Sequence, residues 1–399
     1  MARTKEKRKV SAAPDSLGPA LILVLAVFSL TLFGCVMIYS ASSISAISEQ
    51  TNSASYLIDQ LTFVVVGIVA AFIIWKFFPY HIWTGMAIWV IWIIAMVLLA
   101  LTAITGIAAL GAQRWLVLGP ISLQPSEFVK IALVMMAAKL FSDWRVGGVD
   151  TQRFIVQVVL YLLIPTVFLF ASQSDLGTTA IIVLGIIAVM WLGEVPLKTI
   201  LAVVGGALAF AMLATVFSSY RGGRWLYLDP WNDGQNGYGA GYQIIHSFYA
   251  FAEGGIFGVG LGNSREKYLY LPESETDFIY AIIGEELGLI GAVAVILVFL
   301  LILWAGLRIA RSAEDDFGTM IAGSLTIMLV FQAFLNIGCV IGVFPTTGKP
   351  LPFVSSGGSS LIASYIMVGV ILSVAKGSST SAPERRRENF RVVRSRGRT

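Results

Sequence analysis

Residues 82–104 read IWTGMAIWVIWIIAMVLLALTAI, a run of 23 residues without a single charge. Roughly 20 apolar residues in a helix cross the hydrocarbon layer of a membrane, so this run is long enough to span it. The whole chain shares this character, because 57% of its residues are hydrophobic, only 13% are charged and its mean hydropathy is +0.82. Soluble domains carry about 25% charged residues. The composition therefore excludes a soluble domain and predicts an integral membrane protein.

Ten apolar runs of this kind follow one another along the 399 residues. They predict membrane helices at 18–41, 58–78, 82–104, 126–142, 154–171, 179–193, 198–218, 278–307, 318–343 and 357–375. We expect an all-α, polytopic membrane domain at 18–376, with basic tails at 1–17 and 377–399. The long outer connection 219–277 joins the seventh and eighth helices. It contains a predicted interfacial helix at Tyr242–Glu253, and a glycine-rich bend follows that helix.

Lysine and arginine are distributed unevenly between the predicted connections. With the N-terminus in the cytoplasm, the inner segments hold 20 of these residues and the outer segments hold 7. The positive-inside rule selects this orientation, so both termini are predicted to be cytoplasmic. The basic tails are interpreted as flanks lying near anionic lipid, and not as nucleic-acid-binding arms. Any chemistry is then expected on the outer face, where the longest connection lies.

The two cysteines, Cys35 and Cys339, lie inside apolar runs, where cysteine usually packs as a small hydrophobic residue. Together with two distant histidines they offer neither a disulfide framework nor zinc-ligand spacing. The sequence therefore gives no metal-ligand set of its own.

Ionisable residues at the outer helix ends are the first candidates for a functional site, because charge at membrane depth is costly. The segment QPSEFVK (124–130) opens the fourth predicted helix. Ser126 after Pro125 suits a helix start, and Glu127 in the first turn is favoured by the helix dipole. Glu127 and Lys130 share a helix face. They form either a simple ion pair at a capped helix end or an acid and a base that line a cavity.

Two further outer segments carry charge. Arg114, in GAQRW (111–115), either binds a phosphate group through paired hydrogen bonds or extends to the interface beside Trp115. Asp175, in QSDLGTT (173–179), opens the sixth predicted helix. It is either the N-cap of that helix or a residue of the same site.

Asp277, in LPESETDF (271–278), stands where the eighth predicted helix enters the membrane. A fixed, partly desolvated carboxylate at this place fits a general base for a substrate hydroxyl, and a helix N-cap is the alternative. Deeper in the same helix, Glu286 is predicted to bond a neighbouring helix. Gln332 and Asn336 are predicted to join helices in the same way.

These segments resemble, in their order along the chain, the motifs of the SEDS family (shape, elongation, division and sporulation proteins: FtsW, RodA and SpoVE). The resemblance covers roughly residues 18–376 and rests on segments 111–115, 124–130, 175–178, 271–278, 284–288, 351–353 and 357–360. Segments 262–264, 283–286 and 345–348 make the FtsW subfamily the most similar. The departures from the family pattern are Ser174, Glu275, Lys349 and Ser356, and none is expected to touch the candidate acids and bases.

The resemblance implies a peptidoglycan glycosyltransferase that polymerises lipid II on the outer face of the bacterial cytoplasmic membrane during cell division. It implies Asp277 as the general base. The implied substrate-binding residues are Arg114, Gln124, Ser126, Glu127, Lys130 and Asp175. Arg114 and Lys130 are the candidate cations for the leaving pyrophosphate, and a divalent cation, Mg²⁺ or Mn²⁺, is a further candidate. The implied partners are a class B penicillin-binding transpeptidase and other division proteins.

A lipid II flippase is the main rival function, because Glu285 and Glu286 lie deeper in the eighth predicted helix. The chain shows no repeat of paired halves, which counts against a transporter. Two more interpretations stay open, namely an elongation or sporulation paralogue of the same enzyme and a catalytically silent scaffold. Charges concentrated at outer helix ends favour the enzyme.

Overall fold

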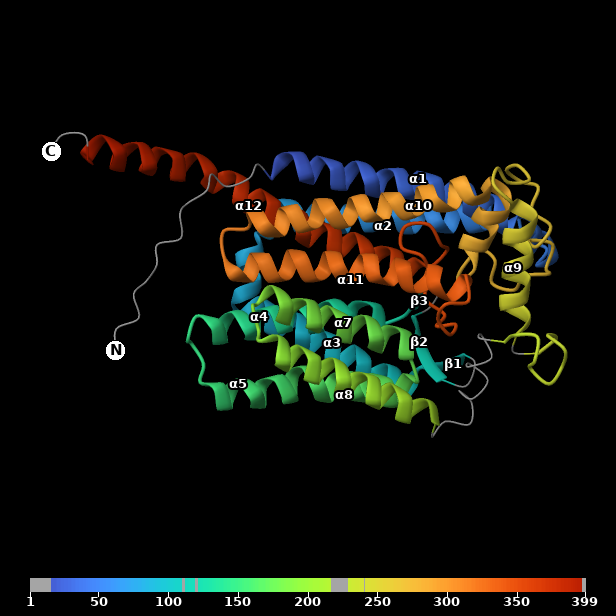
Figure 1. Ribbon diagram of the computed structural model, residues 1–399, viewed down its shortest axis with the longest axis horizontal. Helices are drawn as coiled ribbons and strands as arrows, with labels where there is room; N and C mark the ends of the chain where they lie inside the picture. The colour runs from blue at the N-terminus through green and yellow to red at the C-terminus, as the bar shows by residue number, and fades with distance from the viewer. Residues whose placement is uncertain (1–15, 110–111, 119–120, 217–228, 240, 397–399) are drawn as a thin grey trace.

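The computed structural model describes residues 16–109, 112–118, 121–216, 229–239 and 241–396, and most of them form a bundle of nearly parallel helices (Figure 1). Each of the ten predicted membrane runs coincides with a helical segment. These segments are α1 (Leu17–Ser48), α2 (Ser55–Phe77), α3 (Met86–Thr105), α4 (Ser126–Arg145), the continuous α5, η2 and α6 (Thr151–Val158, Val159–Leu163 and Ile164–Gln173), α7 (Leu176–Leu192), α8 (Leu197–Val216), α10 (Ile279–Ser312), α11 (Asp316–Val340) and α12 (Gly358–Arg396). The predicted all-α fold is confirmed.

The outside of the bundle is apolar. In the described part of the chain, seven helical segments are long and apolar enough to cross a membrane, while α7 and α8 are shorter apolar helices. The apolar window of α11 is 83% buried, whereas those of α2 and α3 are only 22% buried. Helix α11 therefore lies in the core, and α2 and α3 present large apolar side chains such as Val65 and Ile104 to the surroundings. A surface of this kind belongs in lipid, so the chain is a multi-pass membrane protein.

The two ends of the bundle differ. Helix α1 starts and α12 leaves at the same end, on the left in Figure 1, as an even number of crossings requires. Helix α12 continues through the basic segment to Arg396 and passes beyond the bundle, while residues 1–15 of the predicted N-terminal tail lie outside the described residues. Helix α9 (Tyr242–Gly254) lies across the opposite end, where a helix was predicted.

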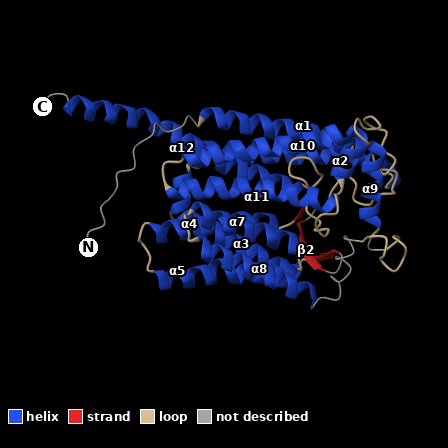
Figure 2. Ribbon diagram, viewed as in Figure 1, coloured by secondary structure: helices blue, strands red, loops and turns tan. Residues whose placement is uncertain are grey.

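A small antiparallel sheet occupies the same end as α9 and is an addition to the all-helical prediction (Figure 2). Its strands are β1 (Ile107–Ala109), β2 (Ala112–Leu118) and β3 (Ile121–Leu123), in that order across the sheet. Strand β2 pairs with β3 through Leu116 opposite Leu123. The sheet fills the connection between α3 and α4 and so places Arg114 near the helix ends on the α9 side of the bundle.

Helix α10 is not continuous, although its sequence predicted an unbroken helix. Gly288 has φ of 66° and ψ of −166°, values outside the helical region. The glycine-rich bend packs on this kink, and its backbone supplies partners, because the Leu289 N–H donates to Gly255 and the Val259 N–H donates to the Glu285 carbonyl. A Cβ on Gly258 would lie 2.2 Å from the Glu286 carbonyl oxygen. Glycine is thus required where the outer connection touches α10.

Candidate active site

The amino end of α4 carries a buried ion pair. The Lys130 Nζ donates to Glu127 Oε2 at 2.5 Å and to Gln332 Oε1 of α11 at 2.6 Å, and all of these side chains are buried. The spacing of three residues places Glu127 and Lys130 on one helix face, as predicted. Ser126 is the first helical residue, and the N-cap position is Pro125 with no side-chain bond. The Ser126 Oγ is buried and has no hydrogen-bond partner among the described residues.

Asp175 has two functions at the start of α7. It is the N-cap, since its Oδ1 accepts a hydrogen bond from the Thr178 N–H at 2.9 Å. Its Oδ2 accepts a hydrogen bond from the Lys349 Nζ at 2.8 Å. Burial raises the pKa of Asp175, but Lys349 and Arg114 lower it by more, so the pKa falls to about 2. Asp175 is therefore both the predicted N-cap and a member of a buried charged group, and it is ionised at neutral pH.

Lys349 joins the two acids, contrary to the expectation that no departure from the family pattern touches them. Its ammonium is 2.8 Å from Asp175 Oδ2 and 3.4 Å from Glu127 Oε1, and its side chain is only 2% exposed. The sequence could not show this, because Lys349 is 174 residues away from Asp175. The result is a fully buried cluster of two carboxylates and two ammonium groups. We call Glu127, Lys130, Asp175 and Lys349 the charge cluster.

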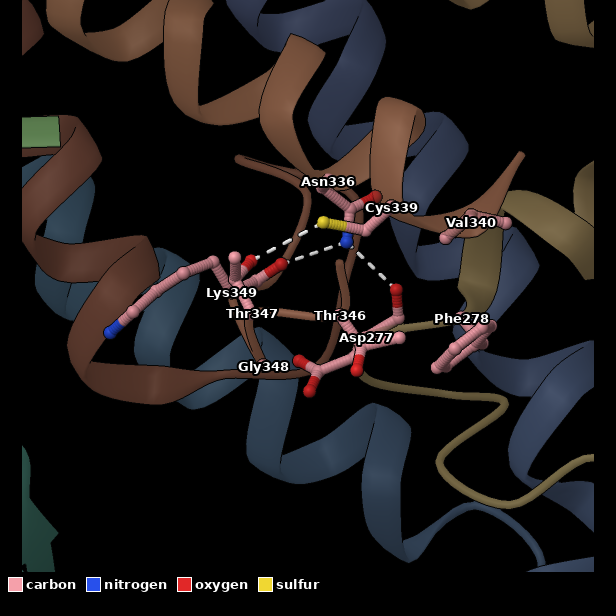
Figure 3. Close-up of a pocket in the computed structure, with 9 residues that line it drawn as sticks. All are labelled: Asp277, Phe278, Asn336, Cys339, Val340, Thr346, Thr347, Gly348 and Lys349. Atoms are coloured by element: carbon pink, nitrogen blue, oxygen red, sulfur yellow. Dashed lines mark hydrogen bonds between the residues drawn. The ribbon is translucent and has the colours of Figure 1, made fainter. Parts of the chain in front are cut away.

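Asp277 lies beside this cluster and lines a small cavity (Figure 3). The cavity holds about 10 Å³, and Asn336, Cys339 and the segment Thr346–Lys349 form much of its wall. Space of this size admits about one water molecule. Figure 3 shows the Asp277 carboxylate beside Gly348, whereas the Lys349 side chain extends away from it, and its ammonium bonds Asp175 of the charge cluster.

The Asp277 carboxylate is not a helix cap. Helix α10 starts at Ile279 with Phe278 as its N-cap, and no side chain caps it. Within the described residues the carboxylate accepts no hydrogen bond, while the backbone carbonyl of Asp277 accepts one from Asn336 Nδ2 at 2.7 Å. Burial, followed by the charge of Glu273, raises the pKa of Asp277 to about 6. A carboxylate with a free oxygen and a pKa near the working pH suits proton abstraction.

Arg114 and Gln124 belong to the framework of the site. The Arg114 Nε donates to the Gln173 carbonyl at 2.9 Å and Nη2 donates to the Ser174 carbonyl at 3.1 Å, which caps the carboxyl end of α6. The sequence did not predict this contact, and phosphate binding by Arg114 stays a prediction. The Gln124 N–H donates to Ser359 Oγ at the start of α12. No described contact places the Gln124 side chain in the cavity.

Gln332 and Asn336 are functional neighbours that the sequence suggested only as links between helices. Gln332 does link helices, because it accepts from Lys130 of α4 and donates to Ser360 Oγ of α12. Asn336 instead holds two connections together, donating to the carbonyls of both Asp277 and Lys349 at 2.7 Å. Their spacing of four residues, which puts two amides on one face of an apolar helix, was the available signal.

Glu285 and Glu286 form a separate buried group. Ser40 Oγ of α1 donates to Glu286 at 2.7 Å, as the predicted bond to a neighbouring helix requires. The Lys267 Nζ lies 3.1 Å from the same carboxylate. Glu285 accepts hydrogen bonds from Ser264 Oγ and the Arg265 N–H, both at 2.5 Å. These two acids hold the outer connection onto α10.

The described residues contain no group of three or more His, Cys, Asp or Glu side chains arranged to hold a metal ion. Near the cavity, the carboxylates of Glu127 and Asp175 are already bound by lysine. The residues present do not fit a protein-built divalent-cation site.

Comparison with known proteins agrees with this architecture. The family model described as "Cell cycle protein", for FtsW, RodA and SpoVE, matches residues 20–380. Stage V sporulation protein E of Bacillus subtilis is 36% identical over 90% of this chain and 98% of its own length. The probable peptidoglycan glycosyltransferase FtsW of Geobacter metallireducens is 39% identical over 89% and 94%.

Solved structures show the same fold. A chain of a peptidoglycan synthase complex, described as coordinating polymerization and crosslinking, matches with a TM-score of 0.71 and 26% identity over 89% of this chain and 97% of that one. The rod shape determining protein RodA of Thermus thermophilus matches with a TM-score of 0.65 and 25% identity over 89% and 95%. The chain therefore belongs to the FtsW, RodA and SpoVE family of cell cycle proteins.

Proposed function

We propose that this protein is a peptidoglycan glycosyltransferase that polymerises lipid II on the outer face of the cytoplasmic membrane. The names of its FtsW relatives support the reaction class. The observation that carries the proposal is the Asp277 carboxylate, which accepts no hydrogen bond among the described residues and faces a cavity beside the charge cluster. Ionised side chains at an outer helix end suit a reaction between lipid-anchored, water-exposed sugars.

In the proposed step, a hydroxyl of the acceptor sugar attacks the anomeric carbon of the donor. Asp277 takes the hydroxyl proton, a new glycosidic C–O bond forms, and the C–O bond to the lipid pyrophosphate breaks. Negative charge grows on the leaving pyrophosphate, so nearby cations lower the barrier. Arg114 and Lys130 are the candidates.

These cations are engaged in the structure, and the cavity is too small for a sugar. Lys130 contacts the Glu127 carboxylate, and Arg114 contacts backbone carbonyls. Substrate binding must therefore widen the cavity. The pyrophosphate then either accepts hydrogen bonds from these cations in place of their present partners, or it is stabilised by their charge at longer range. Both routes need movement of the segment before α10, which lines the cavity opposite the Thr346–Lys349 wall.

The flippase hypothesis loses its main support. It depended on Glu285 and Glu286 as mid-depth charges on a transport path. In the structure both acids are buried and bonded to Ser40, Lys267 and the backbone of the outer connection. Such partners give them a structural use.

We also propose the biological setting implied by the family. A class B penicillin-binding transpeptidase is the partner, in line with the similar chain from a peptidoglycan synthase complex. The segments 262–264 and 345–348 favour the FtsW role in division, together with other division proteins. Both termini would then be cytoplasmic, at the end of the bundle away from α9.

The test is polymerisation of labelled lipid II by the purified protein, with and without its transpeptidase partner. We expect glycan chains to form, and partner addition to increase their yield. A parallel assay in vesicles measures transbilayer movement of lipid II. Movement without polymerisation, under conditions in which the partner is bound, would assign the protein to the flippase class and overturn the proposal.

A further inference from the structure

Lys349 connects two parts of the site through opposite ends of the residue. Its ammonium binds Asp175 and Glu127 in the charge cluster. Its backbone carbonyl accepts a hydrogen bond from Asn336 Nδ2, and the same amide nitrogen donates to the Asp277 carbonyl. The segment Thr346–Lys349 thus forms a cavity wall that is fixed at both of its faces (Figure 3).

The packing around this side chain leaves little freedom. A Cβ on Gly177 would lie 2.8 Å from Lys349 Cγ and 3.0 Å from Thr347 Cβ, so α7 approaches this wall as closely as a glycine permits. Gly348 has φ of +66°, and a Cβ there would lie 3.3 Å from Asp277 Oδ2. The wall is therefore packed between α7 and Asp277, and the Lys349 side chain fills the contact with α7.

We propose that Lys349 is a positioning residue for glycosyl transfer, which ties the wall Thr346–Lys349 to the charge cluster and thereby fixes the cavity around Asp277. This inference rests on the proposed function, in which Asp277 is the base. The family resemblance did not suggest it, because lysine at this position is a departure from the family pattern. Loss of the tie lets the wall shift, and misplacing a reacting group by about 1 Å can cost 10²-fold in rate.

Among the described residues, charges from four elements act on Asp277. Glu273 lies on its own connection, Lys349 on the cavity wall, Asp175 at α7 and Arg114 on β2. The two acids raise the pKa of Asp277, and the two cations lower it. Removal of the Lys349 charge therefore raises this pKa, and the acid limb of the pH–rate profile moves to higher pH.

The experiment measures kcat and KM for labelled lipid II between about pH 5 and pH 9, using the full chain with its transpeptidase partner. Lys349→Met should lower kcat by about tenfold or more and move the acid limb upward, with a smaller change in KM. Lys349→Arg keeps the charge and should restore the position of the limb. Lys267→Met is the matched control, because it removes another buried lysine, bound to Glu286, and should leave the limb unchanged.

Several outcomes overturn the proposal. One is a Lys349→Met variant with wild-type kcat and limb, and another is a loss of activity that follows only the amount of folded protein. If Lys349→Met does not fold, the double variant with Asp175→Asn removes both partners of the pair. A purely structural role predicts that this double variant regains activity, whereas positioning predicts that it folds and stays slow. Wild-type activity of Asp277→Asn would instead show that Asp277 is not the base. The positioning role of Lys349 would then be judged from the kcat of Lys349→Met alone.

Discussion

Replacement of Asp277 by asparagine separates chemistry from structure at this site. The substitution keeps the shape of the side chain, and it removes no hydrogen bond, since within the described residues the carboxylate accepts none. The bond from Asn336 goes to the backbone carbonyl and survives the change. Because the fold raises the pKa of Asp277, its ionised form opposes folding as the pH rises through that pKa. The thermal stability of Asp277→Asn should therefore equal or exceed that of the wild type near neutral pH.

The expected loss of activity is large. Asparagine cannot accept the proton, and general-base catalysis contributes about 10²–10⁴ in rate, or about 3–5 kcal/mol of transition-state stabilisation. The wild type should show a characteristic pH dependence of its polymerisation rate. With a pKa of about 6, about nine-tenths of Asp277 is ionised at pH 7 and about one-tenth at pH 5, so polymerisation should fall about tenfold between these values.

The assay is initial-rate polymerisation of labelled lipid II by protein matched for amount and for partner binding. Glu273→Gln is the control, because it removes a charge that raises the pKa of Asp277. It should move the acid limb to lower pH and keep the rate on the plateau. Wild-type polymerisation by Asp277→Asn would refute the base assignment, and so would an acid limb that Glu273→Gln leaves in place.

Three further predictions concern other parts of the chain. Lys130→Ala leaves Glu127 with one cation instead of two, so activity should be lost and the free energy of unfolding should fall by up to about 3–5 kcal/mol. If the variant also fails to accumulate in the membrane, the Glu127–Lys130 pair has only a structural role. Gly288→Ala puts a side chain at positive φ against the outer connection, so the melting temperature should fall measurably, and an unchanged value would mean that the kink is dispensable. Reporters after Thr399 and near Gln235 should report cytoplasm and exterior respectively, and the same side for both would contradict the three crossings predicted between them.

The sequence was sufficient for the helices and for the type of solvent around them. An uncharged run such as 82–104 forms a helix because lipid offers no partner for backbone groups, so the hydrogen bonds must close within the segment. That requirement is local, and each predicted run has its helix. The helix start at Ser126 and the facing of Glu127 and Lys130 were equally local, because they follow from residue order and helix period.

Contacts between distant segments were decided only in three dimensions. The pairing of Lys349 with Asp175 depends on how α4, α7 and the connection after α11 meet, and no periodicity in either segment encodes it. The same packing uses Arg114 on the end of α6 and leaves the Asp277 carboxylate without a hydrogen-bond donor among the described residues. A charge in a low-dielectric interior binds whichever opposite charge the packing brings to it, and its neighbours then set its pKa. Local sequence therefore determined which charged groups stand at these helix ends, and tertiary packing determined which of them are paired and which one, in the proposed mechanism, takes a proton.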